Sequence, residues 1–324
     1  MSPYLGFWGK LKKPFFVLAP LANVTDAPFR RIIAKYGRPD VTWTEFVSAD
    51  GLCHPEGRQA LLRDLWYTEE ERPIVAQLFT AHPGAMFEAA KIVTELGFDG
   101  IDINMGCPDK NVMKQGAGAT CMKDPELAKR LIIAAREGSI AAGRELPISV
   151  KTRLGFNEDI LEEWLLTLLA AQPAAITIHA RTKKEMSKVP ARWERIKRAV
   201  DIAKGSGTLI IGNGDARDLT DAKAKTQETG ADGVMLGRAI FGNPWLFDRE
   251  KKSVTVEEKL RVAVLHTRLF EETWSDTKSF ELMKKHYQAY IHGFPRAKEL
   301  RAELMTCKDA TRVESVVKKF LAGL

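Results

Sequence analysis

The stretch GIDINMGCP at residues 100–108 decides the fold class, because a short apolar run ends there in polar and reactive side chains. Seven other runs of this kind occur, each followed by a longer stretch with the apolar spacing of a helix, such as residues 83–96 and 125–142. Eight strand-helix units predict an α/β fold, a closed (β/α)8 barrel rather than an open doubly wound sheet. The predicted strands are residues 15–20, 41–46, 74–79, 100–106, 148–153, 175–181, 208–215 and 233–238.

Polar groups end nearly all of the predicted strands, whereas the residues before them are apolar. The carboxyl ends of barrel strands converge on one rim, and barrel enzymes build their active sites there. We therefore expect a functional site on this rim. Its polar residues are Asn23, Glu45, Gln77, Asn104 with Cys107, Lys151, His179, Asn213 with Asp215, and Arg238.

The strand pattern stops after Trp245, and a helical region follows. From Val256 onward we predict four helices, separated near residues 275–276, 293–295 and 308–309. The chain is accordingly divided into a barrel domain, residues 1–248, and a helical domain, residues 249–324. The helical domain carries +5 of the formal net charge of +7, which favours contact with phosphate groups, although charges scattered over exposed helix faces would give the same count.

The composition is that of a globular protein from a reducing compartment. Of the 324 residues 45% are hydrophobic, and no run approaches the roughly 20 apolar residues that a membrane helix needs. The four cysteines lack the spacing of a zinc site and the density of a disulfide scaffold, so we expect a cytoplasmic protein without a bound metal. Three lysines before the apolar run 14–22 also fit a signal peptide, but cleavage there would remove the first predicted strand.

Cys107 lies just past the fourth predicted strand, before a loop at residues 115–119 that contains two glycines. A lone cysteine is more often a small buried apolar residue, but the rim position and the adjoining glycines favour a functional thiol. An ordinary thiol is mostly protonated near neutral pH, so it can donate a proton to a carbon that becomes carbanionic. A nucleophilic role would need a paired base, and the local sequence identifies none.

Basic side chains close the fifth and sixth predicted strands. Lys151 is predicted to face the barrel interior, where a buried ammonium needs an anionic partner, either a carboxylate of a neighbouring strand or an anionic cofactor such as a flavin. We expect that His179 and Arg181 do not both face inward, and we assign His179 to the interior and Arg181 to the rim. The loops at residues 212–215 and 236–238 place glycines where many barrels bind phosphate, which favours a phosphorylated cofactor over ordinary turns.

These motifs resemble the tRNA-dihydrouridine synthase family, from about residue 15 to the C-terminal helices. The stretch APLANVTDAPFR at residues 19–30 resembles the opening motif of the family, and residues 102–108 with 114–119 resemble its catalytic segment. The other matching segments, which resemble flavin-contacting motifs and a helical RNA-binding domain, are residues 150–153, 178–182, 212–215, 237–238, 283–287, 293–295 and Arg301.

The resemblance implies an FMN-dependent oxidoreductase that reduces the C5=C6 bond of uridine in tRNA, with NADPH as the electron donor. Hydride would pass from flavin N5 to C6, Cys107 would protonate C5, and Asn104 and Arg181 would contact the substrate. We expect a monomer without membrane association, and ribosomal RNA is an alternative substrate. The residues implied to surround FMN are Pro20, Leu21, Ala22, Gln77, Lys151, His179, Asn213, Gly214, Asp215, Gly237 and Arg238.

Two departures from the family pattern bear on the choice of RNA. Ala180 stands where a glycine is common, and residues 183–193 lack the usual pattern with Tyr and Gly. The competing interpretations are a flavin barrel acting on a free pyrimidine, which the basic helical tail disfavours, and an RNA-binding protein without turnover. Removal of residues 249–324 is predicted to spare flavin binding and weaken RNA binding, provided that the barrel stays folded.

Overall fold

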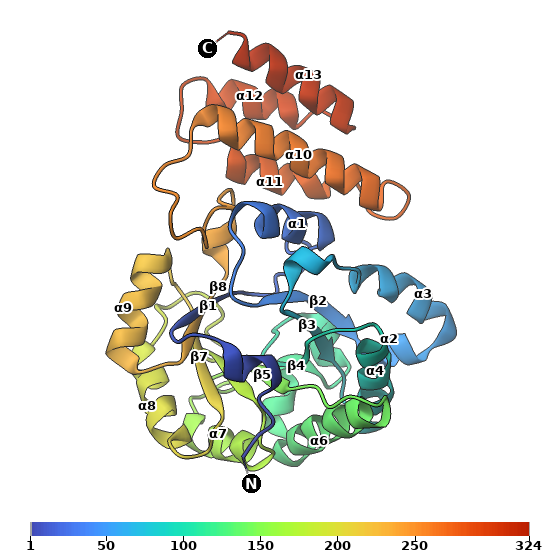
Figure 1. The fold of residues 1–324 in the computed structure, drawn as a ribbon, viewed down its shortest axis with the longest axis vertical. Helices are drawn as coiled ribbons and strands as arrows, with labels where there is room; N and C mark the ends of the chain where they lie inside the picture. Colours follow the sequence, from blue (N-terminus) through green and yellow to red (C-terminus); the bar gives the residue numbers. More distant parts are fainter. Residues whose placement is uncertain (1, 324) are drawn as a thin grey trace.

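The computed structural model describes residues 2–323, and eight parallel strands alternate with helices around a barrel (Figure 1). The strand order is β1-β8-β7-β6-β5-β4-β3-β2, and a parallel bridge from Val17 to Val41 joins β1 to the segment before β2. The predicted (β/α)8 barrel is therefore confirmed. The strands are β1 (Phe15–Leu18), β2 (Thr42–Ser48), β3 (Ile74–Phe79), β4 (Gly100–Met105), β5 (Ile148–Arg153), β6 (Ala175–His179), β7 (Leu209–Asn213) and β8 (Gly233–Leu236).

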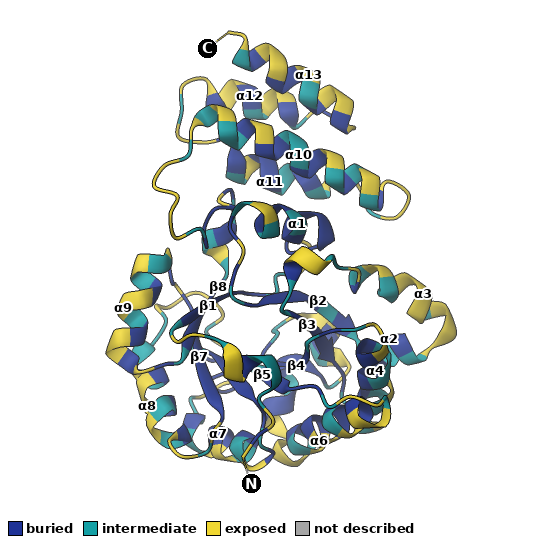
Figure 2. Cartoon of the chain, viewed as in Figure 1, coloured by how far each residue is buried: buried dark blue, intermediate teal, exposed yellow. Residues whose placement is uncertain are grey.

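The sequence located all eight strands, and β3 and β5 have the predicted bounds. Most of the others end one or two residues earlier than predicted, because the chain leaves the ladder before the polar rim residues such as Arg181 and Arg238. Every residue of β3 and β4 is buried, as expected for parallel strands covered on one side by the barrel interior and on the other by helices. Figure 2 shows this buried sheet inside a ring of helices with exposed outer faces.

The helices of the barrel begin where the local sequence supplies a cap. Asp26, Asp124 and Asp218 each accept a hydrogen bond from the backbone N–H three residues later, which satisfies a free donor of the first turn. Among residues 2–323 no helix is long and apolar enough to cross a membrane. The barrel helices are α1 (Ala27–Tyr36), α2 (Ala49–Cys53), α3 (Pro55–Asp64), α4 (Pro83–Glu95), α5 (Lys110–Lys114), α6 (Pro125–Ala141), α7 (Leu161–Ala170), α8 (Trp193–Ala203) and α9 (Leu219–Thr229).

The four predicted C-terminal helices are confirmed, and they pack on the barrel through α1 (Figure 1). Phe29 of α1 is fully buried, and its ring lies 4.9 Å from the rings of both His266 and His286. One apolar cluster runs from β1 and β8 through α1 into these helices, so the helical region and the barrel share a core. The helices are α10 (Val256–Trp274), α11 (Leu282–Tyr290), α12 (Ala297–Leu304) and α13 (Ala310–Leu321).

Candidate active site

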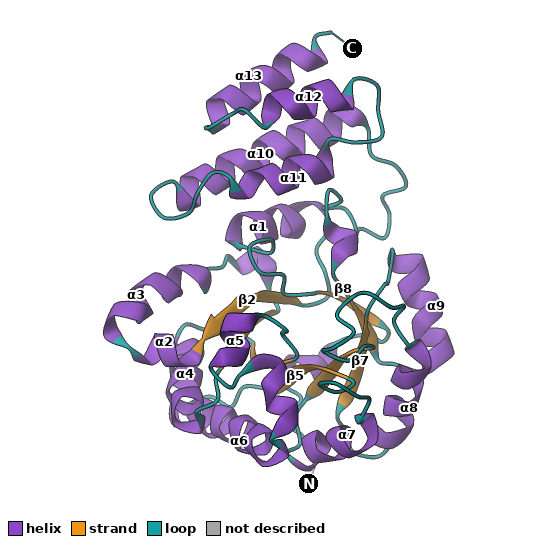
Figure 3. Cartoon of the chain, turned by 180° about the vertical axis from the view of Figure 1, so that it is seen from behind, coloured by secondary structure: helices purple, strands orange, loops and turns teal. Residues whose placement is uncertain are grey.

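A cavity of about 700 Å³ opens at the carboxyl ends of the strands. Figure 3 looks onto this end of the barrel, where α5 and the loops that follow the strands lie over the sheet. Asn23 and Glu45, which were also expected on the rim, do not line this cavity, whereas all of the residues expected to act on the cofactor or the substrate do. The expected residues that line it are Pro20, Leu21, Ala22, Gln77, Asn104, Cys107, Lys151, His179, Arg181, Asn213, Gly214, Asp215, Gly237 and Arg238.

Cys107 is held in a compact loop by backbone contacts on both sides. Its N–H donates to Asn104 Oδ1 at 2.9 Å, and its carbonyl accepts from the N–H of Ala119 at 2.9 Å. Gly118 is required for this closure, because it has a φ of +60° and a Cβ there would lie 2.8 Å from the Cys107 carbonyl oxygen. Burial raises the pKa of the Cys107 thiol, so the thiol is protonated at neutral pH.

A chain of buried polar groups fixes Asn104 beside Cys107. Ser149 donates to Asp102 at 2.6 Å, Gln77 Nε2 donates to the other oxygen of Asp102 at 2.7 Å, and Asn104 Nδ2 donates to Gln77 Oε1 at 3.2 Å. Burial raises the pKa of Asp102 to about 6, and its accepting oxygens set the orientation of the Gln77 amide. Asn104 thus keeps one N–H free of these contacts, which leaves it able to bind a ligand.

Lys151 is the cation at the centre of the cavity wall. Among residues 2–323 no carboxylate lies within ion-pair distance of its Nζ, and no hydrogen bond to it is found, so the carboxylate partner considered from the sequence is not present. Burial and the nearby Arg153 lower the pKa of Lys151 to about 8. The Lys151 side chain is half-buried, and the carboxylate of Asp102 acts on it only through charge and without an ion pair, so a bound anion would be stabilised beside it.

Arg181, His179, Asp215 and Arg238 form a charged cluster at the ends of β6, β7 and β8. Asp215 accepts from Arg181 through one oxygen and from Arg238 at 2.6 Å through the other. Arg181 Nη1 lies 3.1 Å from His179 Nε2, and because a guanidinium only donates, Nε2 accepts and Nδ1 carries the proton. Burial and the surrounding cations lower the pKa of His179 to about 2, so this imidazole is neutral.

The expected separation of His179 and Arg181 is wrong. Both side chains line the cavity and contact each other, and Arg181 is almost fully buried. β6 ends at His179 and the chain bends at residues 180 and 181, where the N–H of Arg181 donates to the carbonyl of His179 at 2.7 Å. This bend, rather than the alternation of a strand, brings the Arg181 side chain beside His179. Gly214, with a φ of +126°, completes this corner, because a Cβ there would lie 3.2 Å from the His179 ring.

Several lining residues were not assigned a role from the sequence. Arg153, which lies in the segment 150–153 that resembles a flavin-contacting motif, lines the cavity and connects two loops, since it donates to the carbonyl of Gly106 at 2.8 Å and to that of Met186 at 3.1 Å. Its spacing of two from Lys151 on β5 places both side chains on one face. Phe46 and Met235 also line the cavity, but an apolar residue in a strand looks the same in sequence whether it meets a ligand or the core.

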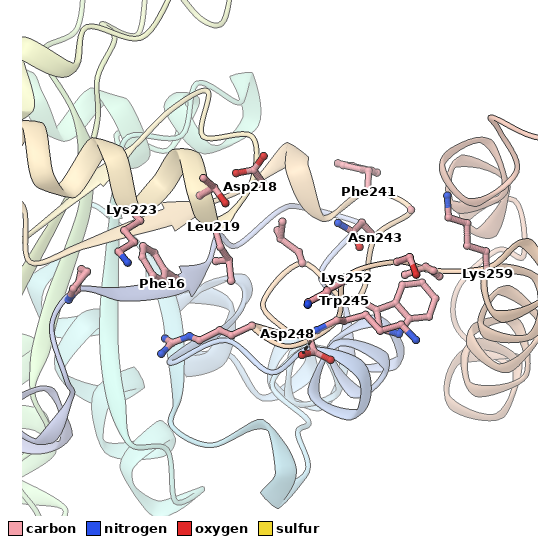
Figure 4. Close-up of a pocket in the computed structure, with 18 of the residues that line it drawn as sticks. Phe16, Asp218, Leu219, Lys223, Phe241, Asn243, Trp245, Asp248, Lys252 and Lys259 are labelled. Carbon is pink, nitrogen blue, oxygen red and sulfur yellow. Dashed lines mark hydrogen bonds between the residues drawn. The ribbon is translucent and has the colours of Figure 1, made fainter.

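A second cavity, of about 1010 Å³, lies between α9, the segment after β8 and α10. We call it the basic groove. Figure 4 shows Lys223 of α9 and Lys259 of α10 on opposite sides, with Lys252 and Trp245 between them. Within residues 2–323, no ion pair is found for Lys12, Lys223, Lys252 or Lys259, whereas the other lining cations Lys13, Arg249 and Lys251 are paired with carboxylates.

The two cavities approach each other along one segment of the chain. Asp215 and Ala216 line the first and Asp218 lines the basic groove, so only Arg217 separates the two linings in the sequence. The described part of the chain contains no group of three or more His, Cys, Asp or Glu residues that could hold a metal ion. The chemically active side chains that line the first cavity include the Cys107 thiol, the Lys151 ammonium and the guanidinium groups of Arg153, Arg181 and Arg238.

A parallel barrel with such a cavity at its carboxyl end is the architecture of an enzyme. A family model described as dihydrouridine synthase (Dus) matches residues 17–323. The chain is 39% identical over 327 residues to "Probable tRNA-dihydrouridine synthase 2" of Bacillus subtilis (strain 168), with 98% of each chain covered. It is 38% identical over 322 residues to "Probable tRNA-dihydrouridine synthase" of Staphylococcus aureus (strain MRSA252), with 98% of this chain and 96% of the other covered. The chain belongs to the dihydrouridine synthase family and is an oxidoreductase.

Two solved structures share the barrel fold. Histamine dehydrogenase from Rhizobium sp. 4-9 superposes with a TM-score of 0.54 at 14% identity over 78% of this chain and 48% of that chain. A 2-naphthoyl-CoA reductase in complex with 2-naphthoyl-CoA superposes with a TM-score of 0.52 at 13% identity over 72% of this chain and 49% of that chain. The matched region is about half the length of each of these proteins. Membership of the dihydrouridine synthase family implies a flavin enzyme.

Proposed function

We propose that this enzyme is an FMN-dependent tRNA-dihydrouridine synthase that reduces the C5=C6 bond of uridine and takes its electrons from NADPH. The names of relatives that match 98% of the chain support tRNA as the substrate. The observation that carries the mechanism is that one cavity holds both a protonated thiol, Cys107, and an unpaired ammonium, Lys151. The thiol can donate a proton, and the ammonium can face a negatively charged ring.

The cavity fits FMN in size and charge. Its volume of about 700 Å³ is within the range of small-molecule sites, and its lining has five Lys or Arg side chains but only two carboxylates, Asp109 and Asp215. A Cβ on Gly237 would have no neighbour closer than 3.6 Å, so the backbone there is open to a ligand. When bound, FMN supplies the hydride for C6 of the uracil. The residues that would hold it are Pro20, Leu21, Ala22, Gln77, Lys151, His179, Asn213, Gly214, Asp215, Gly237 and Arg238.

The side chains around the cofactor have separable roles. Lys151 would stabilise negative charge on the bound ring, and the neutral His179 would donate one hydrogen bond from Nδ1. Arg238 has a side chain that is 67% exposed, whereas Arg153 and Arg181 are buried, so Arg238 would contact the phosphate end of the cofactor. Arg181, held by Asp215, would keep His179 in this tautomer and contribute positive charge toward the substrate.

The substrate side of the cavity is formed by Asn104 and Cys107. Asn104 is fixed by Gln77 and by the N–H of Cys107, so its free N–H would hold an edge of the uracil. The Cys107 thiol would deliver its proton to C5 as C6 receives the hydride, and water would then return a proton to the thiolate. A uridine must leave its stack to reach this position, which is the usual requirement for chemistry on a base.

The pH dependence of FMN affinity provides a test of Lys151. Because the pKa of Lys151 is about 8, the ammonium is present at pH 7 and is lost as pH rises through 8. The Kd for FMN is expected to rise between pH 7 and pH 9, by at most about ten-fold per pH unit. Lys151→Met is expected to bind FMN about ten-fold more weakly than the wild type at pH 7. Its Kd should not rise further between pH 7 and pH 9, because the variant has no ammonium to lose. Fluorescence titration of FMN at each pH measures both, and an equal slope in the two proteins would remove Lys151 from the site.

The basic groove is proposed to contact the phosphate backbone of the RNA. The double variant Lys223→Gln/Lys252→Gln removes two unpaired cations on two different segments. It is expected to weaken tRNA binding and to reduce the slope of log K against log salt by about 1.4–1.8, because each lost phosphate contact releases one counterion fewer. Lys91→Gln/Lys129→Gln, which removes two cations already paired on α4 and α6, is the control and should leave the slope unchanged. Equal slopes in both variants would count against RNA contact in the groove.

The activity is tested directly by spectroscopy. The purified protein is expected to bind FMN, to lose its visible absorption on addition of NADPH, and to regain it only when unmodified tRNA is added, with formation of dihydrouridine. Reoxidation by a free pyrimidine but not by tRNA would favour the competing interpretation, and reoxidation by ribosomal RNA alone would change the substrate. Absence of flavin binding after reconstitution would overturn the proposal.

A further inference from the structure

The loop that joins β1 to α1 forms one wall of the cavity through residues 19–22. The tip of this loop is Asn23, a non-glycine residue with a φ of +56°, which is an uncommon conformation that the surroundings must hold in place. Its backbone N–H donates to Glu45 Oε1 of β2. The position of this cavity wall therefore depends on the carboxylate of Glu45.

Glu45 lies in a crowded acidic environment. It is almost fully buried, and burial together with the carboxylates of Asp26 and Asp64 raises its pKa. Among residues 2–323, the one cation within ion-pair distance of Glu45 is Lys278, whose Nζ lies 3.7 Å from Oε2. Lys285 is the other nearby cation that acts on Glu45, through charge at a longer distance.

Lys278 comes from the other part of the molecule, the segment between α10 and α11. Its Nζ contacts Asp64 of α3 at 2.7 Å and lies 4.2 Å from the centre of the Trp274 ring, which fixes its direction. Trp274 in turn donates to the buried Asp26, the cap of α1, at 3.2 Å. In Figure 1 the connection from α10 to α11 is on the same side of the molecule as α3, as these contacts require.

We propose that Lys278 is a positioning residue for the cofactor site: through Glu45 it holds the β1–α1 loop in the form that the flavin pocket needs. The helical region then completes the FMN site in addition to any role in binding RNA. The inference rests on the proposed function, because it assigns the wall at residues 19–22 to FMN. Without the ammonium, Glu45 would face Asp26 and Asp64 with less compensating charge, and its hold on Asn23 would weaken.

The test is FMN affinity in the full-length protein without RNA. Lys278→Met keeps the length of the side chain and removes its charge, and it is expected to raise the Kd for FMN about ten-fold, as for loss of a partly buried ion pair. Lys278→Arg is expected to restore an affinity within about two-fold of the wild type, because it restores the cation. Lys129→Met is the matched control, since Lys129 is also paired and partly exposed but lies on α6, and its Kd should not change.

Hydrogen exchange separates local positioning from a general loss of stability. In Lys278→Met the amides of residues 19–26 are expected to exchange faster, while those of β3 and β4 keep the wild-type rate. Faster exchange throughout the barrel strands with a raised Kd would mean that Lys278 only stabilises the fold, and the proposal would be overturned. A folded Lys278→Met that binds FMN as tightly as the wild type would also overturn it.

A double-mutant cycle with Glu45 tests whether Lys278 acts on the β1–α1 loop through Glu45. Glu45→Leu removes the acceptor of the Asn23 N–H and is expected to raise the Kd for FMN by a similar factor or more, and adding Lys278→Met to it should change the Kd little further, because Lys278 acts through Glu45. If Lys278→Met alone does not fold, the Kd of Glu45→Leu decides the test, and an unchanged Kd in that variant overturns the proposal. Failure of the wild type itself to bind FMN would instead refute the proposed function.

Discussion

Replacing Cys107 with alanine is expected to lower the rate of uridine reduction by about 10²–10⁴-fold, while the Kd values for FMN and tRNA stay close to those of the wild type. The raised pKa keeps the thiol protonated at neutral pH, and no base is hydrogen-bonded to the sulfur in the described structure. The thiol is therefore suited to donate a proton rather than to attack as a nucleophile. Alanine removes the proton donor without adding bulk to the cavity, so binding should survive.

Single-turnover kinetics with pre-reduced enzyme measures this effect apart from reduction by NADPH. Cys53→Ala is the matched control, because Cys53 is also a free, partly buried thiol but lies on α2 outside the cavity, and its rate should equal that of the wild type. Turnover of Cys107→Ala within a few-fold of the wild type would remove the thiol from the mechanism. Loss of flavin from this variant would mean that Cys107 supports the fold of the site instead.

Deleting residues 249–324 is expected to unfold the barrel, in contrast to the prediction from the sequence that flavin binding would survive. The deletion would expose the apolar face of α1, including the fully buried Phe29, and remove the partner of Asp26 in Trp274. Each large apolar side chain that becomes exposed costs about 1.5–3 kcal/mol of folding free energy, so several of them cost more than about 5 kcal/mol. This cost is comparable to the total stability of many proteins. It also removes Lys278, which we assign to the FMN site.

Soluble yield, near-UV circular dichroism and FMN titration of the truncated chain measure this outcome.

The substitution Phe29→Ala in the full chain is a milder test of the same contact between the barrel and the helical region. It is expected to lower the free energy of unfolding, measured by urea titration, by about 3–5 kcal/mol. Leu166→Ala, at a leucine of α7 that is 59% exposed, is the control and should change it by less than about 0.5 kcal/mol. A soluble truncated barrel with wild-type FMN affinity would show that the helical region is an independent appendage.

The sequence was sufficient for the fold class and for the identity of most cavity residues. Apolar runs at regular intervals are a local property of the chain, and their polar ends fall on one rim once eight such units close into a barrel. Polar residues at strand ends, such as Gln77 and Asn213, were therefore found from their position alone. The assignment of Arg181 to a different direction from His179 was wrong, because the chain bends directly after β6 and brings the two side chains into contact.

By itself the sequence determined the barrel, the four C-terminal helices and most of the polar residues at the strand ends, because hydrophobic spacing and chain order are enough to specify these, whereas Pro20, Leu21 and Ala22 were implied by the family resemblance. Only the tertiary structure decided that Lys151 has no carboxylate partner, that Phe29 joins the two regions in one core, and that Lys278 reaches Glu45. The physical reason is distance along the chain: Lys278 and Glu45 are 233 residues apart, and charge pairing and burial between such segments exist only after the chain has folded.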